Sequence, residues 1–262
     1  MIKLNNEVFE QKFYPDGTPL IRSISPFTHD IAWYFDSMDE LFTVSCIVRH
    51  LQERGFKTTL FMPYIPNARM DRIKTYEDVF TLKYFCEAIN AMHFASVAVL
   101  DPHSSVSAGL LDRVMCLEPL RLIEHARHEI FQKTGENPFF VYPDEGAMKR
   151  YQKTGQYTFC VKHRNWEDGH IQGLDMIGEI PSDYPALIID DICSRGGTFI
   201  HTAAKLKELG VKSVFLCVTH CENTILAGDL LNGEYVDGVF TTNSIFRGDH
   251  PMISVMEAKE AF

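Results

Sequence analysis

Residues 190–198, with the sequence DDICSRGGT, combine residue types that suit the binding of a phosphorylated sugar. Two adjacent glycines allow the backbone to approach a ligand closely with its N–H groups turned inward. A helix starting directly behind them would add a partial positive charge that suits a phosphate. The other side chains offer hydroxyl groups, and carboxylates that accept hydrogen bonds from sugar hydroxyls. The glycines are Gly196 and Gly197, the hydroxyl groups belong to Ser194 and Thr198, and the carboxylates belong to Asp190 and Asp191.

This stretch also has a simpler interpretation, a structural turn in which Thr198 caps a helix. It is not a Walker A loop, because no Gly-Lys-Ser/Thr follows, and it lacks the Gly-x-Gly-x-x-Gly of dinucleotide-binding sheets. Two acidic residues in front of a Gly-Gly pair favour the phosphate site over the plain turn.

The elements that must position this loop can be predicted from the apolar periodicity. Residues 186–190 predict a buried strand, 198–209 a helix whose C-terminal glycine is Gly210, and 211–218 the next strand. Similar patterns predict strands over 57–62, 96–100 and 139–142 and helices over 79–92 and 119–132. Strand–helix–strand repeated in this way predicts an α/β fold of parallel sheets flanked by helices. Two similar halves would join between residues 117 and 137.

Composition limits the classes of function. The chain has 262 residues, and 25 Lys and Arg against 35 Asp and Glu give a formal net charge of −10. This acidic balance argues against nucleic acid or an anionic membrane as a partner. No apolar run approaches the ~20 residues that span a bilayer, and we see no signal-peptide core. Seven cysteines without a Cys-x-x-Cys pair are typical of buried free thiols in a reducing compartment, so we expect a cytoplasmic protein.

Further motifs follow in a fixed order along the chain. They are YPDGT at 14–18, PYIPNARMDR at 63–72, DPHS at 101–104, YPDEG at 142–146, KHR at 162–164 and TNSI at 242–245. The loop at 190–198 resembles the phosphoribosyl diphosphate (PRPP) motif of type I phosphoribosyltransferases and of PRPP synthetases. The other motifs resemble those of the synthetases, in the same order and over residues 13–247. The sequence is therefore similar to the ribose-phosphate pyrophosphokinase (PRPP synthetase) family.

This resemblance implies an architecture and a reaction. It implies two half-domains like type I phosphoribosyltransferases, each with a mainly parallel sheet: 1–120 on the ATP side and 121–244 with the ribose-phosphate loop. Residues 245–262 would return to the first half. Enzymes of the family transfer the β,γ-diphosphoryl group of ATP to the C1 hydroxyl of ribose 5-phosphate and release AMP. Because such a transition state spreads negative charge over phosphoryl oxygens, positioning and cations are expected to carry the catalysis.

The resemblance also implies a role for each motif. His103 and Asp144 would hold Mg²⁺ on the ATP phosphates, and a carboxylate is a ligand that magnesium accepts readily. Arg69 and Asp71, with His103, would bind the triphosphate, and Tyr14 and Asp16 would contact the adenine across a subunit interface. Lys162 and Arg164, on a closing loop over 162–173, would be the catalytic cations. The ribose phosphate would be bound by Asp190, Asp191 and the loop from Ser194 to Thr198, which includes Arg195, Gly196 and Gly197. The adenine contact implies a homodimer or higher oligomer.

Several positions differ from the family pattern. Only about a dozen residues precede the motif at 14–18, Thr18 replaces a glutamate, and Met70 replaces a glutamine. Arg195 stands where a small threonine is usual, and a guanidinium can bridge two phosphates. Trp166 follows the catalytic cations and could pack or stack on a base.

These differences leave the acceptor open. Ribose 5-phosphate is the first candidate, and ADP-ribose, used by some relatives in rebuilding NAD, is the second. A catalytically silent regulatory homologue and a true phosphoribosyltransferase are the remaining alternatives. The retained residues His103, Asp144, Lys162 and Arg164 argue against the silent homologue, and the motifs around Arg69 and His103 against the transferase.

Overall fold

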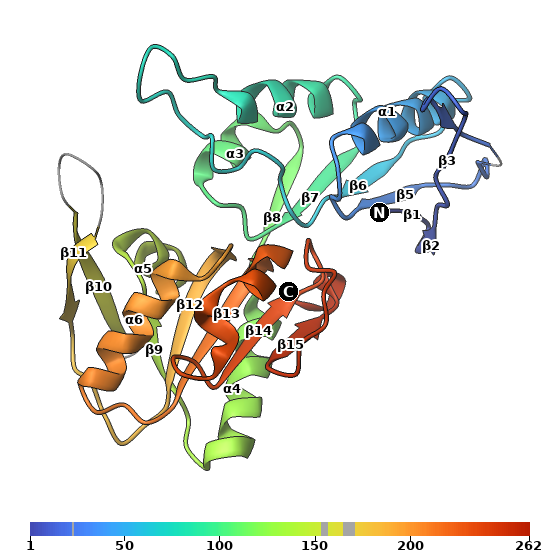
Figure 1. Ribbon diagram of the computed structural model, residues 1–262. Helices are drawn as coiled ribbons and strands as arrows, with labels where there is room; N and C mark the ends of the chain where they lie inside the picture. The colour runs from blue at the N-terminus through green and yellow to red at the C-terminus, as the bar shows by residue number, and fades with distance from the viewer. Residues whose placement is uncertain (23, 153–156, 165–170) are drawn as a thin grey trace. The chain divides into compact units, whose positions relative to one another are not determined.

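The computed structural model describes residues 1–22, 24–152, 157–164 and 171–262 (Figure 1). By its internal contacts the chain divides into two units, Met1–Glu118 and Pro119–Phe262. This division lies inside the span of 117–137 where we expected two halves to join, and just before the expected boundary at residue 120. Within the described ranges, no helix combines the length and the apolar character needed to cross a membrane.

The first unit is built on a six-stranded sheet with the order β2-β1-β5-β6-β7-β8. Strands β5 to β8 are parallel, whereas β1 and β2 add antiparallel pairs at one edge. The strands are β1 Ile2–Leu4, β2 Glu7–Val8, β5 Asp30–Trp33, β6 Thr59–Phe61, β7 Ser96–Leu100 and β8 Val114–Leu117. The helices are α1 Asp39–Gln52, α2 Thr81–Asn90 and α3 Ser105–Leu110. Strands β3 Lys12–Phe13 and β4 Pro19–Leu20 form a separate two-stranded hairpin.

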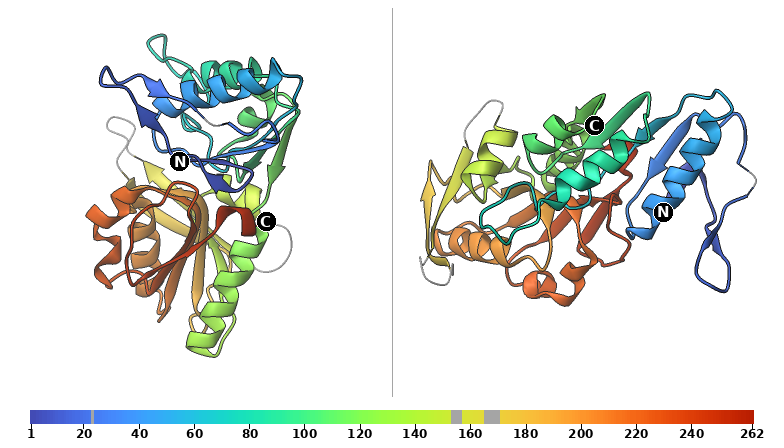
Figure 2. Two further views of the ribbon diagram at one scale, coloured as in Figure 1. Left: turned by 90° about the vertical axis from the view of Figure 1, so that its right-hand side faces the viewer. Right: turned by 90° about the horizontal axis from the view of Figure 1, so that it is seen from above.

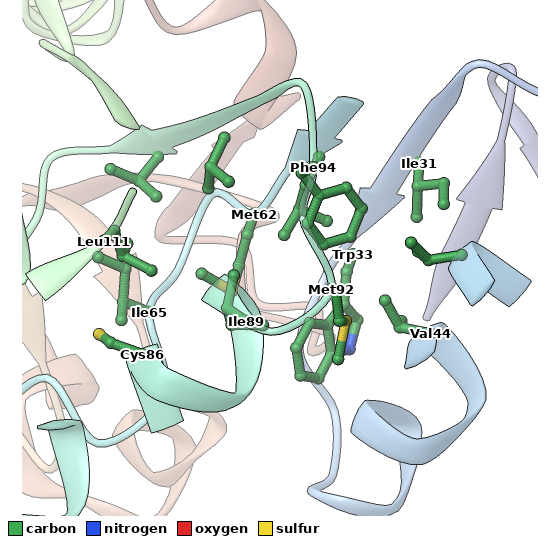
Figure 3. Packing of buried hydrophobic residues seen from close by; sticks show 14 of the residues in the cluster. Ile31, Trp33, Val44, Met62, Ile65, Cys86, Ile89, Met92, Phe94 and Leu111 are labelled. Atoms are coloured by element: carbon green, nitrogen blue, oxygen red, sulfur yellow. The ribbon is translucent and has the colours of Figure 1, made fainter. Parts of the chain in front are cut away.

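The core of the first unit lies between its sheet and helices α1 and α2 (Figure 3). Helix α1 contributes Val44 and its neighbours at helical spacing, because apolar residues three and four apart share one face. Trp33 on β5 is fully buried, and its indole N–H donates to the Glu40 carboxylate of α1 at 2.7 Å. The one polar atom of this large core residue is thus satisfied.

The second unit has a seven-stranded sheet with the order β11-β10-β9-β12-β13-β14-β15. All neighbours are parallel except β10 and β11, which form an antiparallel pair. The strands are β9 Phe139–Tyr142, β10 Tyr157–Arg164, β11 Ile171–Ile177, β12 Ala186–Cys193, β13 Val214–Cys221, β14 Gly238–Thr242 and β15 Ile253–Met256. The helices are α4 Leu120–Thr134, α5 Glu145–Tyr151 and α6 Gly197–Glu208, with short 3-10 turns η1 Asn223–Ala227, η2 Asp229–Asn232 and η3 Ala258–Glu260. Helices α4 and α6 lie on opposite faces of this sheet (Figure 2).

The C-terminal segment differs from the sequence-based expectation. Strand β15 pairs in parallel with β14, with Ile253 opposite Val239. The Ala261 carbonyl accepts a hydrogen bond of 3.0 Å from the backbone N–H of Arg121, at the start of α4. Residues 253–261 therefore lie with the second unit, whereas the sequence led us to expect that 245–262 returns to the first half. Apolar residues of β15 extend the parallel sheet at its edge, a pairing that the local sequence does not reveal.

Candidate active site

The predicted phosphate loop joins strand β12 to helix α6. Gly196 is the N-cap of α6 and has φ = +87°, a conformation that side-chain-bearing residues rarely adopt. A Cβ atom at this position would lie 2.8 Å from Leu230 Cδ2, so the close packing also requires glycine. Gly197 is exposed at the first turn of α6, where unpaired N–H groups and the helix dipole favour an anion. The loop therefore has the local geometry of an anion site.

The segment from Glu222 to Leu230 supports this loop from behind. The Ser194 hydroxyl donates to Glu222 Oε2 at 2.6 Å, and the Thr224 hydroxyl donates to the same oxygen at 3.1 Å. The Glu222 N–H donates to the Cys193 carbonyl at 2.8 Å. A Cβ on Gly228 would lie 2.3 Å from the carbonyl oxygen of Arg195, so this backbone approaches the loop very closely. The Ser194 hydroxyl is thus directed at a carboxylate, where the sequence predicted a donor to phosphate.

The two predicted ribose-binding aspartates lie at the carboxyl end of β12 and differ in their surroundings. Asp191 is 3% exposed, and Arg150 Nη1 lies 2.8 Å from its Oδ1. Asp190 Oδ1 accepts a hydrogen bond of 2.9 Å from the Asp191 N–H. Burial, and then the charges of Asp191 and Asp144, raise the pKa of Asp190 well above its ordinary value. The pair is therefore set up to hold one negative charge more readily than two.

Asp144, the predicted magnesium ligand of this unit, begins helix α5. Its Oδ1 accepts a hydrogen bond of 3.0 Å from the Ala147 N–H, which caps the helix. The structure brings Asp144 close enough to Asp190 for its charge to affect the pKa of that carboxyl. Three of the predicted acidic residues, Asp144, Asp190 and Asp191, thus gather at one end of the sheet.

The predicted catalytic cations Lys162 and Arg164 lie on strand β10. In the antiparallel pair with β11, Lys162 stands opposite Leu174, and Arg164 stands opposite Ile171. A register shift, typical of a β-bulge, occurs between His163 and Arg164. The sequence placed these residues on a loop over 162–173, so the structure corrects their secondary structure. Trp166 lies outside the described residues.

In the first unit, the structure brings Asp71 together with His103 and Ser104. Asp71 is 5% exposed, and its carboxylate accepts hydrogen bonds of 2.7 Å and 3.1 Å from the Arg72 guanidinium. The Arg72 contact, the Ser104 hydroxyl and the charges of Arg72 and His103 together lower the pKa of Asp71. The predicted triphosphate residues 69–71 and the DPHS motif therefore share one end of the sheet. Arg69 is exposed there.

The predicted adenine-binding residues lie on the tip of the β3–β4 hairpin. The Tyr14 N–H donates to the Thr18 carbonyl at 2.8 Å, which closes the turn, and the Tyr14 ring is 47% exposed. Asp16 Oδ1 accepts hydrogen bonds from the Thr18 hydroxyl at 2.7 Å and the Thr18 N–H at 3.0 Å. These contacts lower the pKa of Asp16. Thr18 thus organises the turn at the position where the family pattern has a glutamate.

Sequence reasoning missed two charged residues of the second unit, Arg150 and Glu222. Arg150 lies on helix α5, after the YPDEG segment at 142–146, and this proximity to the motif was the one available signal. Glu222 follows the end of β13, and nothing in its local sequence indicates a contact with the loop at Ser194.

The residues expected to hold magnesium are Asp144 and His103. Among the described residues, no three His, Cys, Asp or Glu side chains lie close enough to hold a metal ion on their own. Mg²⁺ is usually held by one or two carboxylates together with substrate phosphates and water. Asp144 offers such a carboxylate in the second unit, and His103 lies in the first.

Comparison with known proteins gives a consistent family. No family model matches the sequence. A ribose-phosphate pyrophosphokinase of Saccharolobus solfataricus is 26% identical over 94% of this chain and 87% of its own length. One from Aquifex aeolicus is 27% identical over 86% of this chain and 71% of its own. The crystal structure of phosphoribosylpyrophosphate synthetase from Mycobacterium smegmatis has a TM-score of 0.76 at 19% identity, covering 98% of this chain and 89% of that one.

These similarities extend over nearly the whole chain and match both sheets. They confirm the predicted α/β class, in which two mainly parallel sheets flanked by helices resemble type I phosphoribosyltransferases. They also confirm the resemblance first seen in the motifs at 63–72, 101–104, 142–146 and 190–198. Over most of its length the chain is therefore similar to ribose-phosphate pyrophosphokinases, which are diphosphokinase-type transferases.

Proposed function

We propose that this protein transfers the β,γ-diphosphoryl group of ATP to the C1 hydroxyl of a 5-phosphorylated ribose and releases AMP. The observation that carries the proposal is the β12–α6 loop, where Gly196 begins a helix next to the paired Asp190 and Asp191. A helix N-terminus binds the phosphate, and the carboxylates accept the ribose hydroxyls. The names of the relatives favour ribose 5-phosphate as the acceptor.

Each group then has one task in the reaction. The loop from Ser194 to Thr198 holds the 5-phosphate, and Asp191 orients the sugar so that its C1 hydroxyl faces ATP. Lys162 and Arg164 neutralise charge on the transferring group, and Arg69 binds the triphosphate, oriented by Asp71. Asp144 in the second unit and His103 in the first would hold magnesium together with the phosphates, and the metal would supply further positive charge for the phosphoryl oxygens.

ADP-ribose is the second candidate acceptor because of Arg195. This residue is exposed on the phosphate loop, where the family pattern has a small threonine. A guanidinium at that place can bind a second phosphate on the same 5-position in a bidentate manner. The product would be the 1-diphosphate of ADP-ribose.

The protein is further proposed to act as a homodimer in the cytoplasm. The exposed rings of Phe13 and Tyr14 on the β3–β4 hairpin support a contact with a second copy, since large exposed apolar groups mark interaction sites. The nucleotide substrates and the acidic net charge favour small-molecule ligands over nucleic acid or membrane.

The test is AMP release from ATP and Mg²⁺, measured in parallel with ribose 5-phosphate and with ADP-ribose. Turnover of either acceptor, abolished in Asp191→Asn, supports the proposal, and the kcat/KM ratio identifies the acceptor. An Arg195→Ala variant that loses only ADP-ribose turnover would establish the second candidate. Absence of AMP release with both acceptors, in a folded protein that binds ATP, would favour a silent regulatory homologue.

A further inference from the structure

Helix α5 delivers one cation to the acidic end of the second sheet. Arg150 lies in the last turn of this helix, and its Nη1 is 2.8 Å from Oδ1 of Asp191. The Asp191 side chain is 4% exposed and that of Arg150 is 24% exposed, so most of this ion pair is removed from water. A pair with this burial is sensitive to the loss of either partner, because the remaining charge is left uncompensated.

Aromatic packing fixes the orientation of Arg150. Its guanidinium carbon lies 5.6 Å from the ring centre of Tyr151, within the range of a cation–π contact. The Tyr151 ring stacks on Tyr142 with centroids 6.4 Å apart and an interplanar angle of 20°. Since Tyr142 ends strand β9 and is 2% exposed, the stack ties the end of α5 to the sheet. Arg150 is therefore held in place before any ligand binds.

Several acidic residues lie near Asp191 at this end of the sheet. Asp190 is its neighbour on β12, and the charges of Asp191 and of Asp144, at the start of α5, both act on the Asp190 carboxyl. Glu222, after β13, adds a further acid at the adjacent loop. On α5 itself, Lys149 is 68% exposed and pairs with Glu145. Arg150 is thus a cation that the structure places directly on the Asp191 carboxylate.

We propose that Arg150 is a positioning residue of the acceptor site, which holds the Asp191 carboxylate in the orientation that receives the hydroxyl groups of a ribosyl phosphate. This inference rests on the proposed function. It predicts that substitution of Arg150 weakens binding of the acceptor and leaves binding of ATP unchanged. The effect passes through Asp191, because Arg150 itself is turned toward the Asp191 carboxylate and the Tyr151 ring.

The test is a set of variants assayed for both substrates. Arg150→Met raises KM for ribose 5-phosphate roughly 10- to 100-fold, the range expected when a contact between charged groups is lost, and leaves KM for ATP unchanged. Arg150→Lys keeps the charge but lacks the planar fork, so it recovers part of the loss. Lys149→Met, on the exposed side of the same helix, is the matched control and behaves as wild type.

A double-substitution cycle shows whether the effect passes through Asp191. If it does, Arg150→Met combined with Asp191→Asn binds acceptor no more weakly than Asp191→Asn alone. The proposal would be overturned if the two substitutions weakened acceptor binding by factors that multiply in the double variant. Equal increases in KM for ATP and for the acceptor would overturn it as well. Far-UV circular dichroism and chemical denaturation verify that each variant is folded.

Calorimetric titration of ribose 5-phosphate and of ADP-ribose without ATP separates this inference from the proposed function. If wild type binds an acceptor without turnover, the proposed reaction fails, while the dependence of binding on Arg150 is still measured. If wild type binds neither acceptor under conditions where it binds ATP, the positioning role fails as well.

Discussion

Replacing Glu222 by glutamine tests whether a carboxylate behind the phosphate loop opposes the binding of phosphate. Glu222 Oε2 accepts the hydroxyl of Ser194 at 2.6 Å and that of Thr224 at 3.1 Å. Glutamine has nearly the same shape and retains one oxygen acceptor for these hydroxyls, but it carries no charge. The substitution therefore removes the charge of the contact and preserves the hydrogen bond.

The magnitude follows from the distance. A phosphate that packs against the Ser194 oxygen from the ligand side, without receiving its proton, is separated from the carboxylate by two successive oxygen–oxygen contacts, an angled path of about 5 Å. Two unit charges at about 5 Å interact by about 3 kcal/mol at an effective dielectric constant of about 20. Partial exposure of Glu222 and screening by salt reduce this to about 1.5 kcal/mol, which is about tenfold in affinity.

We therefore expect Glu222→Gln to lower KM for ribose 5-phosphate about tenfold, with KM for ATP unchanged. ADP-ribose gains less, because each of its phosphates carries about one charge, whereas a phosphate monoester carries about 1.5 to 2. The control is Glu208→Gln, which removes the same charge in the last turn of α6, ~18 Å from the loop along the helix. Unchanged or increased KM for ribose 5-phosphate in a folded Glu222→Gln variant would refute the electrostatic argument.

Three further substitutions test other parts of the structure. Gly228→Ala places a Cβ 2.3 Å from the Arg195 carbonyl oxygen, so it should lower the free energy of unfolding in urea by about 1–3 kcal/mol and weaken acceptor binding. Wild-type values for both would show that the loop is not tightly packed there. Asp71→Asn removes a carboxylate whose pKa is lowered by Arg72. At pH values above 3.8, the ordinary pKa of aspartate, wild type should therefore be more stable than this variant. The difference in stability should disappear as the pH falls through the lower pKa of Asp71 in the folded protein, and a difference that persists to acid pH would contradict the pairing. Cys116 is exposed and should account for the fastest labelling by a thiol reagent, although burial raises its pKa and slows the reaction; a fast phase that remains in Cys116→Ser would contradict this.

The sequence predicts the parallel core of each sheet well because buried strands carry a strong local signal. The predicted strands over 96–100 and 139–142 coincide with β7 and β9, and the helix over 198–209 differs from α6 by one residue at each end. These segments are short apolar runs or amphipathic periods between glycine and proline residues. Their burial on both faces leaves little room for another interpretation.

The edges of the sheets could not be predicted in the same way. Strand β10 ends in Lys162, His163 and Arg164, whose charges resemble a loop, but its backbone pairs with β11. Strand β15 depends on pairing with β14, and β1 and β2 on pairing with β5 and with each other. An edge strand is defined by its partner more than by its own residues, so single-sequence patterns do not detect it.

In the candidate site, too, features encoded by local sequence could be predicted and features that depend on tertiary contacts could not. The motifs supplied the candidate ligand-binding residues, Asp190, Asp191 and the glycine loop, since their types and spacing are local. They did not supply Arg150 and Glu222, because each meets its partner only when α5 or the end of β13 is placed beside β12. Residues that orient other residues are connected by the tertiary fold and leave no signal in the spacing of the sequence.

The charge balance of the second unit argues that cations must accompany the acceptor. The carboxyl groups of Asp144, Asp190, Asp191 and Glu222 surround the loop region, and Arg150 is committed to one of them. For an anionic acceptor to bind there, N–H groups at the start of α6 and a divalent cation would have to offset the remaining carboxylates. We therefore expect removal of Mg²⁺ to weaken binding of ribose 5-phosphate even without ATP. Calorimetry with and without a chelator measures this, with Asp144→Asn as the variant that should lose the magnesium dependence. Equal affinity in both conditions would show that backbone N–H groups and protein cations suffice for the phosphate, and that magnesium acts on ATP alone.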